Sequence, residues 1–150
     1  MYLYSMQVTI RSATIDDVLK ITSLSRQLGY NITEADTSNF LSALLPSGTE
    51  AVYVAEHADN VIGWMQLTHV TRIESGHFME IAGLVVEEAY RSKGIGNMFI
   101  AFAKDQCKQK GIDKLRVRTN TVRLRTHSFY EKSGFTCVKE QKVYEIICSG

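Results

Sequence analysis

Hydrophobic and polar positions along the chain follow two periods, and these predict alternating helices and strands. Apolar positions spaced three to four residues apart predict helices over residues 15–28, 34–45, 98–110 and 123–133. Short runs rich in β-branched and aromatic residues predict strands over residues 8–11, 51–56, 61–70, 78–86, 115–118, 136–139 and 142–147. We therefore expect an α/β (α+β) fold, with a mixed, mostly antiparallel central sheet of about seven strands flanked by about four helices.

Helix boundaries carry capping signals. Thr14 and Thr33 each stand just before acidic residues, which is typical of N-caps. Gly29, Gly111 and Gly134 follow the last apolar position of three of the helices, as C-terminal glycines do. The last two strands are expected to close the sheet as an antiparallel pair.

Composition indicates one domain over residues 1–150. Hydrophobic residues make up 45% and charged residues 22%, which is usual for a globular protein, and we find neither an internal repeat nor a linker-like tract. No apolar run approaches the roughly 20 residues of a membrane span, and the first residues lack the pattern of a secretory signal. Three cysteines without metal-like spacing suggest reduced thiols. We expect a cytoplasmic protein without a membrane partner.

Charge is distributed unevenly. Residues 1–90 hold 4 Lys/Arg and 11 Asp/Glu, a net charge of −7, whereas residues 91–150 hold 13 and 5, a net charge of +8. Scattered solvated charge would explain this, and so would an acidic half that meets a cationic acceptor and a basic half that meets phosphates. The basic stretch has few interleaved aromatic residues and no recognition motif, so nucleic acid is not an expected partner.

A Gly-rich turn between a buried strand and a helix is the strongest local signal. Residues 91–96 read Arg-Ser-Lys-Gly-Ile-Gly, and they follow the apolar run at residues 81–86. The first N–H groups of a helix lack intrahelical partners, and glycine lets an anion approach the backbone. The pattern predicts a pyrophosphate site.

The spacing separates three classes of phosphate ligand. A nucleotide-hydrolase loop would need Lys-Ser/Thr after its last glycine, but Gly96 is followed by Asn97. A dinucleotide fingerprint would need a third glycine where the chain has Phe99. The remaining pattern, Arg-x-x-Gly-x-Gly, is similar to the coenzyme A pyrophosphate loop of the GNAT superfamily of acyl-CoA-dependent N-acetyltransferases. A helix start that binds no ligand is the alternative.

Two further segments carry the same resemblance. Residues 80–91 (EIAGLVVEEAYR) resemble the fourth strand of the family, and residues 120–135 (NTVRLRTHSFYEKSGF) resemble its later Asn…Phe-Tyr-x-x-x-Gly-Phe signature. The resemblance spans about residues 7–147. Ser92 and Thr126 stand where many members carry Gly and Ala.

The resemblance implies an acetyl-CoA-dependent N-acetyltransferase with a small-molecule or peptide amine as acceptor. It places acceptor contacts at the turn that contains Tyr30, although packing at the helix end would also explain that residue. The implied cofactor-binding residues are Leu84, Val85, Val86, Arg91, Ser92, Lys93, Gly94, Ile95, Gly96, Asn97 and Asn120. A backbone N–H near Val85 or Val86 would stabilise the developing oxyanion. Pairing of Leu84 to Val86 with the pantetheine arm requires the fourth and fifth strands to separate.

Glu80 is the predicted general base. Strand alternation places it on a face with Ala82, Leu84 and Val86, where burial would raise its pKa toward a value suited to proton abstraction. Some members of the resembled family carry a catalytic glutamate at this position. The alternative is a carboxylate at the solvent edge of the strand.

Tyr130 is the predicted general acid. A phenol with a pKa of about 10 can protonate a departing thiolate, and the residue lies in the later motif. Phe129 is about 100° away on the helix and is expected to face the core instead. Ordinary packing of Tyr130 is the alternative. Cys107 falls on the apolar stripe of its helix and is not expected to be a nucleophile.

Other functions have less support in the sequence. A non-catalytic acyl-CoA binding or sensing module of the same fold is the principal alternative to the enzyme. The four histidines lie too far apart in sequence to suggest a local metal site, so no metal is expected. The last predicted strand would be able to pair across a homodimer, which the sequence does not decide.

Overall fold

The computed structural model describes residues 6–119 and 123–149. The chain forms two compact units, Met1–Arg118 and Thr119–Gly150. A single domain over residues 1–150 stays a prediction. None of the helices among the described residues is long and apolar enough to span a membrane.

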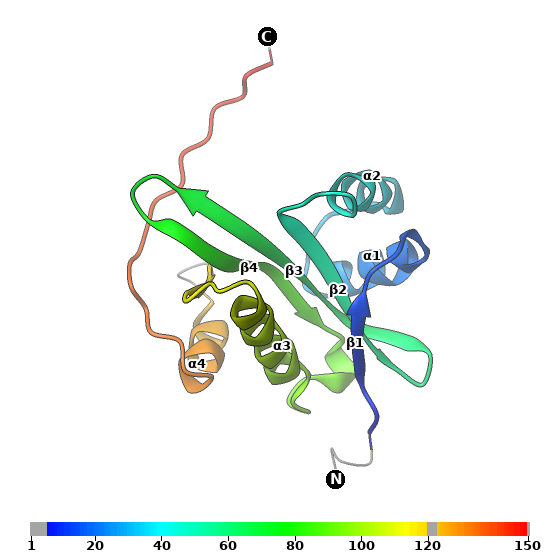
Figure 1. Ribbon diagram of the computed structural model, residues 1–150. Helices are drawn as coiled ribbons and strands as arrows, with labels where there is room; N and C mark the ends of the chain where they lie inside the picture. The colour runs from blue at the N-terminus through cyan, green and yellow to red at the C-terminus, as the bar shows by residue number, and fades with distance from the viewer. Residues whose placement is uncertain (1–5, 120–122, 150) are drawn as a thin grey trace. The chain divides into compact units, whose positions relative to one another are not determined.

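The first unit is a five-stranded sheet with helices on both faces (Figure 1). In sheet order, the strands are β1 (Thr9–Ser12), β2 (Glu50–His57), β3 (Asn60–Arg72), β4 (Gly76–Val86) and β5 (Leu115–Val117). The first four strands pair antiparallel, and β5 pairs parallel to β4. The helices are α1 (Val18–Gln27), α2 (Glu34–Leu44) and α3 (Ile95–Gln109), with short 3-10 helices η2 (Ile15–Asp17) and η3 (Glu88–Tyr90).

Thr33 caps α2 as predicted, whereas Thr14 precedes the 3-10 helix η2 that leads into α1. Thr33 Oγ1 accepts from the Asp36 N–H at 3.1 Å, and Asp36 Oδ2 accepts from the Thr33 N–H at 3.1 Å, which forms a reciprocal capping box at the start of α2. After the C-terminal ends of α1 and α3, Gly29 (φ 90°) and Gly111 (φ 66°) adopt the left-handed conformation that terminates helices. These boundaries were predictable because their chemistry is local.

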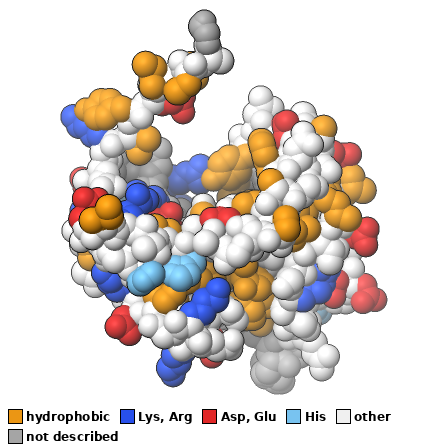
Figure 2. Space-filling model, turned by 45° about the horizontal axis from the view of Figure 1, so that its top comes forward, with side chains coloured by type: hydrophobic (Ala, Val, Ile, Leu, Met, Phe, Trp, Pro, Cys, Tyr) orange, Lys and Arg blue, Asp and Glu red, His pale blue; other side chains and the backbone are white. Residues whose placement is uncertain are grey.

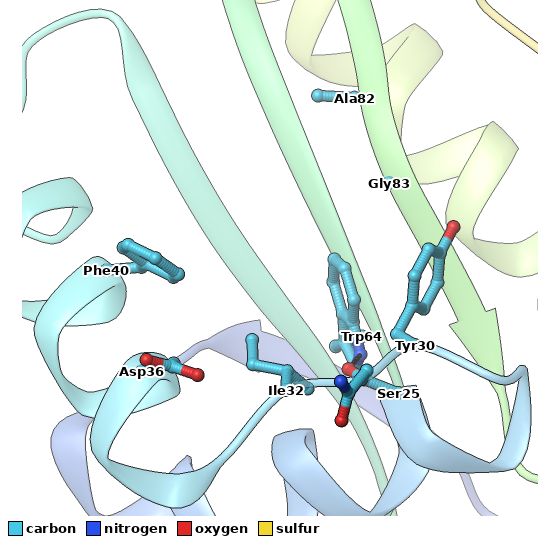
Figure 3. Close-up of a pocket in the computed structure, with 9 residues that line it drawn as sticks. Ser25, Tyr30, Ile32, Asp36, Phe40, Trp64, Ala82 and Gly83 are labelled. Atoms are coloured by element: carbon cyan, nitrogen blue, oxygen red, sulfur yellow. Dashed lines mark hydrogen bonds between the residues drawn. The ribbon is translucent and has the colours of Figure 1, made fainter. Parts of the chain in front are cut away.

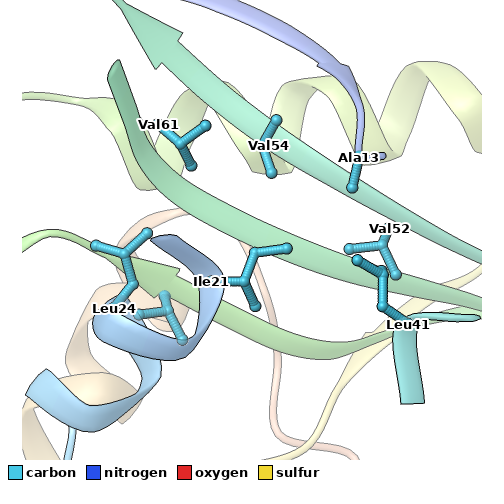
Figure 4. Packing of buried hydrophobic residues seen from close by; sticks show 8 residues of the cluster. Ala13, Ile21, Leu24, Leu41, Val52, Val54 and Val61 are labelled. Carbon is cyan, nitrogen blue, oxygen red and sulfur yellow. The ribbon is translucent and has the colours of Figure 1, made fainter. Parts of the chain in front are cut away.

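The two faces of the sheet pack against different helices. On one face, buried side chains of α1 and α2 lie against the strands, and Figure 4 shows Ile21 and Leu41 near Val52. On the opposite face lies α3: the Phe102 and Tyr53 rings meet edge to face at 4.7 Å, and Phe99 packs against Gly63. Covering both faces buries the β-branched strands, as their continuous apolar runs predicted.

The second unit contains one described helix, α4 (Leu124–Lys132), which ends at Gly134 with φ of 100°. Two aromatic rings pack on Tyr130 within this unit, Phe129 at 5.1 Å and Phe135 at 5.5 Å between centroids. Tyr130 is buried, whereas Phe129 is only partly buried. The prediction that Phe129 rather than Tyr130 faces the core was therefore wrong.

The predicted closing pair at residues 136–139 and 142–147 was also wrong, because the described residues there form no strand. Their side chains are exposed, with Val143 at 89% and Ile146 at 84%, and Figure 2 shows hydrophobic side chains in orange along this end of the chain. A two-residue hairpin needs left-handed residues at its turn, and Glu140-Gln141 supplies neither Gly nor Asn. Apolar alternation alone does not hold an isolated hairpin together. The homodimer stays a prediction.

Candidate functional site

Strand β4 contains an extra residue at its centre. Gln66 pairs with Gly83 while the next residue of β3, Leu67, pairs with Ile81. Ala82 therefore has no partner on β3 and forms a β-bulge. Bulges re-aim side chains, so the faces of β4 differ before and after this point.

The bulge decides which residues share a face with Glu80. Thr68 and Gln66 of β3 both donate to Glu50 Oε1, at 2.7 and 2.8 Å, so both point to the same face. Their partners across the ladder, Glu80 and Gly83, therefore share that face as well. The prediction extended this face to Leu84 and Val86 and was wrong there, since an extra residue turns the rest of the strand over.

Strands β4 and β5 separate partway along β4. Their pairing runs from Met79 opposite Leu115 to Ile81 opposite Val117, where β5 ends. Beyond that pair, the described residues give no further β4–β5 pairing, and residues 82–86 continue beside β3. Over residues 82–86, β4 therefore has no β5 partner among the described residues, which is the condition that pairing with a pantetheine arm would require.

Backbone groups of β4 point into this separation. The Val85 carbonyl faces β3, because its oxygen lies 2.9 Å from the position that a Cβ on Gly63 of β3 would occupy. The Glu87 N–H also faces β3, since it donates to a β3 carbonyl at 2.8 Å. Successive residues of a strand direct their N–H and C=O groups to alternate sides. The groups of Leu84 and Val86 therefore point away from β3. Of the two N–H groups predicted near the oxyanion, that of Val86 faces the open side.

The turn that follows, residues 91–96, is named the anion turn. Ser92 (φ 65°) and Gly94 (φ 87°) both adopt left-handed backbone conformations, and α3 begins at Ile95. The Met98 N–H donates to the Gly94 carbonyl at 3.0 Å as the helix closes its first turn. The N–H groups that precede this bond lie at the positive end of the helix dipole, where an anion is stabilised.

Two cations accompany the anion turn. Arg91 Nε donates to the Val86 carbonyl at 3.1 Å, and Lys93 Nζ lies 5.7 Å from the centroid of the Tyr90 ring. Both side chains are exposed, and the first turn of α3 carries no acidic residue. The Ile95 side chain is buried, so only its backbone can face a ligand. The turn fits a polyphosphate chemically.

Glu80 lies beside the last β4–β5 pair and makes an ion pair. Arg118 Nε donates to Glu80 Oε1 at 2.8 Å, and the Glu80 side chain is 15% exposed whereas that of Arg118 is 50% exposed. The prediction expected a carboxylate in apolar surroundings. The structure instead gives it a charged partner, which holds its oxygens in one position at the start of the strand separation.

A pocket opens on the face that Glu80 and Gly83 share. It has a volume of about 570 Å³ and is called the aromatic pocket. Its lining residues are Ser25, Tyr30, Asn31, Ile32, Asp36, Phe40, Trp64, Ala82 and Gly83. In Figure 3, Asp36 and Phe40 of α2 lie on one side, Tyr30 and Trp64 on the other, and Ile32 between them.

Trp64 and Gly83 form the part of the wall that belongs to the sheet. Trp64 Nε1 donates to Ser25 Oγ at 3.2 Å, and Ser25 Oγ donates to the Ile21 carbonyl at 2.7 Å. A Cβ added to Gly83 would lie 2.8 Å from two atoms of the Trp64 ring. Only glycine therefore lets the indole lie flat against β4 at this position.

The remaining predicted residues are placed as follows. Tyr30 lines the aromatic pocket, and its role in binding substrate stays a prediction. Tyr130 belongs to the second unit, and Asn120 lies outside the described residues. Cys107 is buried on α3, and this burial raises the pKa of its thiol, which disfavours a nucleophilic role.

Several pocket residues were missed from the sequence. Phe40 lies in the helix predicted over residues 34–45 and is 59% exposed, and Trp64 lies in the strand predicted over residues 61–70; neither is among the predicted site residues. Asp36 and Phe40 are four residues apart and so lie on the same face of α2. The sequence did contain a signal for these pocket residues. It is an acidic and an aromatic residue at this spacing, close to the predicted acceptor turn.

Histidines also come closer than their spacing suggested. His69 of β3 and His77 of β4 face each other across the hairpin, with His69 Nε2 3.3 Å from His77 Nδ1. Thr71 Oγ1 lies 2.9 Å from the same His77 nitrogen. This pair lies at the far end of β4 from the anion turn.

Comparisons with known proteins identify the family and the fold. The model of the acetyltransferase (GNAT) family matches residues 15–135. An uncharacterized N-acetyltransferase of Bacillus subtilis, YhfO, is 26% identical over 133 residues, covering 85% of this chain and 89% of its own. Aminoglycoside N-acetyltransferase AAC(6')-Iy in complex with CoA has a similar fold, with a TM-score of 0.84, 17% identity and coverage of 95% of this chain and 97% of its own. A transcriptional regulator from Bacillus halodurans has a TM-score of 0.83, 22% identity and coverage of 93% and 100%.

Proposed function

Because the chain belongs to the acetyltransferase (GNAT) family and is an acyltransferase, we propose that it transfers an acetyl group from acetyl-CoA to a primary amine held in the aromatic pocket. One observation carries this proposal. Ala82 and Gly83 line the pocket, and they also begin the stretch of β4 that has separated from β5. An acceptor in the pocket would therefore lie beside the backbone proposed to hold the acyl donor.

The donor would be held by backbone and charge. The anion turn and Asn97 would take the pyrophosphate, with Arg91 and Lys93 adding positive charge. The amide-bearing arm would pair with the outward groups of Leu84 and Val86, as an added strand does. Asn120 stays a predicted contact of this arm. When bound, acetyl-CoA supplies a thioester whose carbonyl carbon an amine can attack.

The chain's own residues would handle the protons. The amine nitrogen forms a bond to the carbonyl carbon as the C–S bond breaks; one amine proton passes to Glu80, directly or through water, and Tyr130 gives a proton to the thiolate sulfur. The Val86 N–H points to the open side of β4, where it can stabilise the carbonyl oxygen. Direct attack agrees with the burial of Cys107, which leaves that thiol unsuited to carry the acetyl group.

Calorimetric titration of the full chain with acetyl-CoA, followed by a thiol-release assay over a panel of amines, tests the proposal. Micromolar binding with amine-dependent thiol release is the expected result. Binding without release from any amine would instead indicate a non-catalytic acyl-CoA binding module. Absence of binding would show that the anion turn is only a helix start.

Variants of Glu80 and its partner separate catalysis from structure. Glu80→Gln is expected to lower kcat by about 10²-fold, the usual scale of general base catalysis. Arg118→Gln removes the same ion pair but keeps the carboxylate, and Glu74→Gln makes the same charge change at the exposed hairpin tip. If Arg118→Gln lowers kcat as much as Glu80→Gln, the ion pair matters and the base does not.

Tyr130→Phe keeps the ring between Phe129 and Phe135 and removes only the hydroxyl. Turnover is expected to fall, most at high pH, where solvent protonates the leaving thiolate least readily. Unchanged turnover between about pH 6 and 9 would remove Tyr130 from the scheme.

A further inference from the structure

We propose that the acceptor is an amine with a single positive charge on an aromatic or aliphatic hydrocarbon body, and that polyhydroxylated polycations are poor acceptors. This inference rests on the proposed function, because it assigns the chemistry of the amine that the aromatic pocket takes. Three features of the pocket lining support this inference.

The first step is the scarcity of negative charge in the pocket. Asp36 is the one carboxylate among its nine lining residues, and the other polar members, Ser25, Tyr30 and Asn31, are neutral. Ser25 is buried, and its hydroxyl already donates to the Ile21 carbonyl and accepts from Trp64. A ligand with several ammonium groups would lose hydration there and meet a single carboxylate, and unpaired charged groups oppose binding.

The excess of acidic residues in residues 1–90 adds no further carboxylate to the pocket, because many of these side chains bind partners outside its lining. Five carboxylates outside the lining of the pocket have side-chain partners of their own: Asp17 and Glu56 with Arg11, Glu50 with Gln66 and Thr68, Glu87 with Lys20, and Glu80 with Arg118. Among the lining residues, the expectation that an acidic half meets the acceptor therefore narrows to Asp36.

The second step is the exposure of aromatic surface around the opening. Phe40 is 59% exposed and Tyr30 is 48% exposed, although both line the pocket with Trp64 and Ile32. Aromatic groups gathered at a hollow, rather than scattered singly, mark a binding surface. Their faces suit a hydrocarbon body and also attract a nearby ammonium group.

The third step is the fixed position of Asp36. Its Oδ2 accepts from the Thr33 N–H at 3.1 Å within the capping box, which holds the side chain at the first turn of α2. That bond uses one of about four acceptor positions of a carboxylate. The others can take the ammonium form of the substrate, which releases one proton to solvent to give the neutral amine that attacks, while Phe40, one helical turn further along, would lie beside the carbon skeleton.

Trp64 provides a readout that does not depend on turnover. It is the single tryptophan of the chain, so its fluorescence reports directly on the aromatic pocket. We would titrate the full chain with 2-phenylethylamine, spermidine and an aminoglycoside, and would measure kcat/KM for the same three amines. A saturable fluorescence change and a kcat/KM at least about tenfold higher for 2-phenylethylamine are expected.

Two pairs of variants locate the effect. Asp36→Asn keeps an oxygen acceptor for the cap and removes the charge, so the apparent affinity for 2-phenylethylamine should fall about tenfold or more. Glu34→Gln makes the same charge change in the same helical turn outside the pocket and should leave the affinity unchanged. Phe40→Ala should weaken 2-phenylethylamine more than methylamine, whereas Leu45→Ala, at the end of α2, should affect neither.

The outcomes separate this inference from the proposed function. A saturable fluorescence change without turnover of any amine would refute acetyl transfer and retain the ligand class. Turnover that favours spermidine or the aminoglycoside would retain the enzyme and overturn the ligand class. Equal effects of Asp36→Asn and Glu34→Gln would likewise overturn the role of Asp36, and thermal melting of each variant shows whether it is folded.

Discussion

The anion turn and the aromatic pocket lie at the same strand, β4, yet they are built in opposite ways. The anion turn comes from one continuous stretch of chain and offers backbone N–H groups and two cations. The aromatic pocket collects side chains from residues 25 to 83, on α1, α2, their connection and the sheet. The proposed phosphate site is thus a local feature of this chain, whereas the proposed amine site is a tertiary one.

The difference has a physical basis. A helix N-terminus offers the same N–H groups and the same dipole whatever surrounds it, so few residue types suffice to make it an anion site. A hydrocarbon-binding pocket depends on which side chains meet across elements, and hydrophobic attraction carries no direction of its own. The two sites should therefore respond separately to substitution.

The largest expected effect distinguishes two glycines that flank α3 and share a left-handed backbone conformation. Gly94 and Gly111 both have left-handed φ, at 87° and 66°, at opposite ends of the helix. Valine at such a position costs roughly 1–2 kcal/mol or more. Gly94→Val should weaken CoA binding at least about tenfold by calorimetry, because the strain distorts the anion turn.

Gly111→Val is the matched control, since no atom lies within 4 Å of its added Cβ. It should lower the free energy of unfolding and leave CoA affinity unchanged. Equal CoA affinity in both variants would mean that the anion turn does not bind phosphate.

The next effect concerns the wall of the aromatic pocket. Gly83→Ala places a Cβ 2.8 Å from the Trp64 ring, so the indole must move into the pocket. The free energy of unfolding should fall by about 1–3 kcal/mol, and KM for the amine should rise while CoA affinity stays constant. Gly48→Ala, whose Cβ would meet open space, controls for the substitution itself. A fall in CoA affinity with unchanged KM would break the separation of the two sites.

An effect of similar size on stability, with no expected effect on either site, concerns the support of α1, which carries Ser25 of the pocket. Burial of Asp17 acts to raise its pKa, but hydrogen bonds from Arg11 at 2.9 Å and from the Thr14 N–H at 2.8 Å hold the pKa below its usual value. A lowered pKa in the folded state stabilises the fold above the unfolded value of about 4, and this contribution is lost as the pH falls through the folded value.

Asp17→Asn should therefore cost about 1–3 kcal/mol of unfolding free energy at neutral pH, measured by urea denaturation. Its difference from the parent should shrink as the pH falls below about 4. Asp16→Asn, at the exposed neighbouring position, should show neither effect. A pH-independent difference would assign the loss to packing rather than to charge.

The smallest effect tests the departure of the anion turn from the family pattern. Ser92 has a φ of 65°, which glycine adopts more readily. Relief of this strain is partly cancelled by the greater freedom of glycine in the unfolded chain, so Ser92→Gly should raise the free energy of unfolding by less than about 1 kcal/mol. CoA affinity should not fall. A clear loss of affinity would mean that the serine side chain itself contacts the ligand.

Much of the fold followed from local signals. Thr33 and Asp36 predict the start of α2, and the apolar run before residue 87 predicts β4, because capping and β-branched patterning act within a few residues. The tail shows the limit of such signals. Its apolar alternation predicted two strands, but a strand exists only where a partner ladder does, and residues 136–149 have none among the described residues.

The sequence by itself determined the Gly-rich turn at residues 91–96, the capped helices, the positions of five strands along the chain and the family, since each depends on residues that are neighbours along the chain. Only the tertiary structure decided the bulge at Ala82, the separation of β4 from β5, the ion pair of Glu80 with Arg118 and the gathering of Asp36, Phe40 and Trp64. These depend on the register between strands and on which helix covers which face. Register and packing are settled by contacts between distant residues, which a local pattern does not contain.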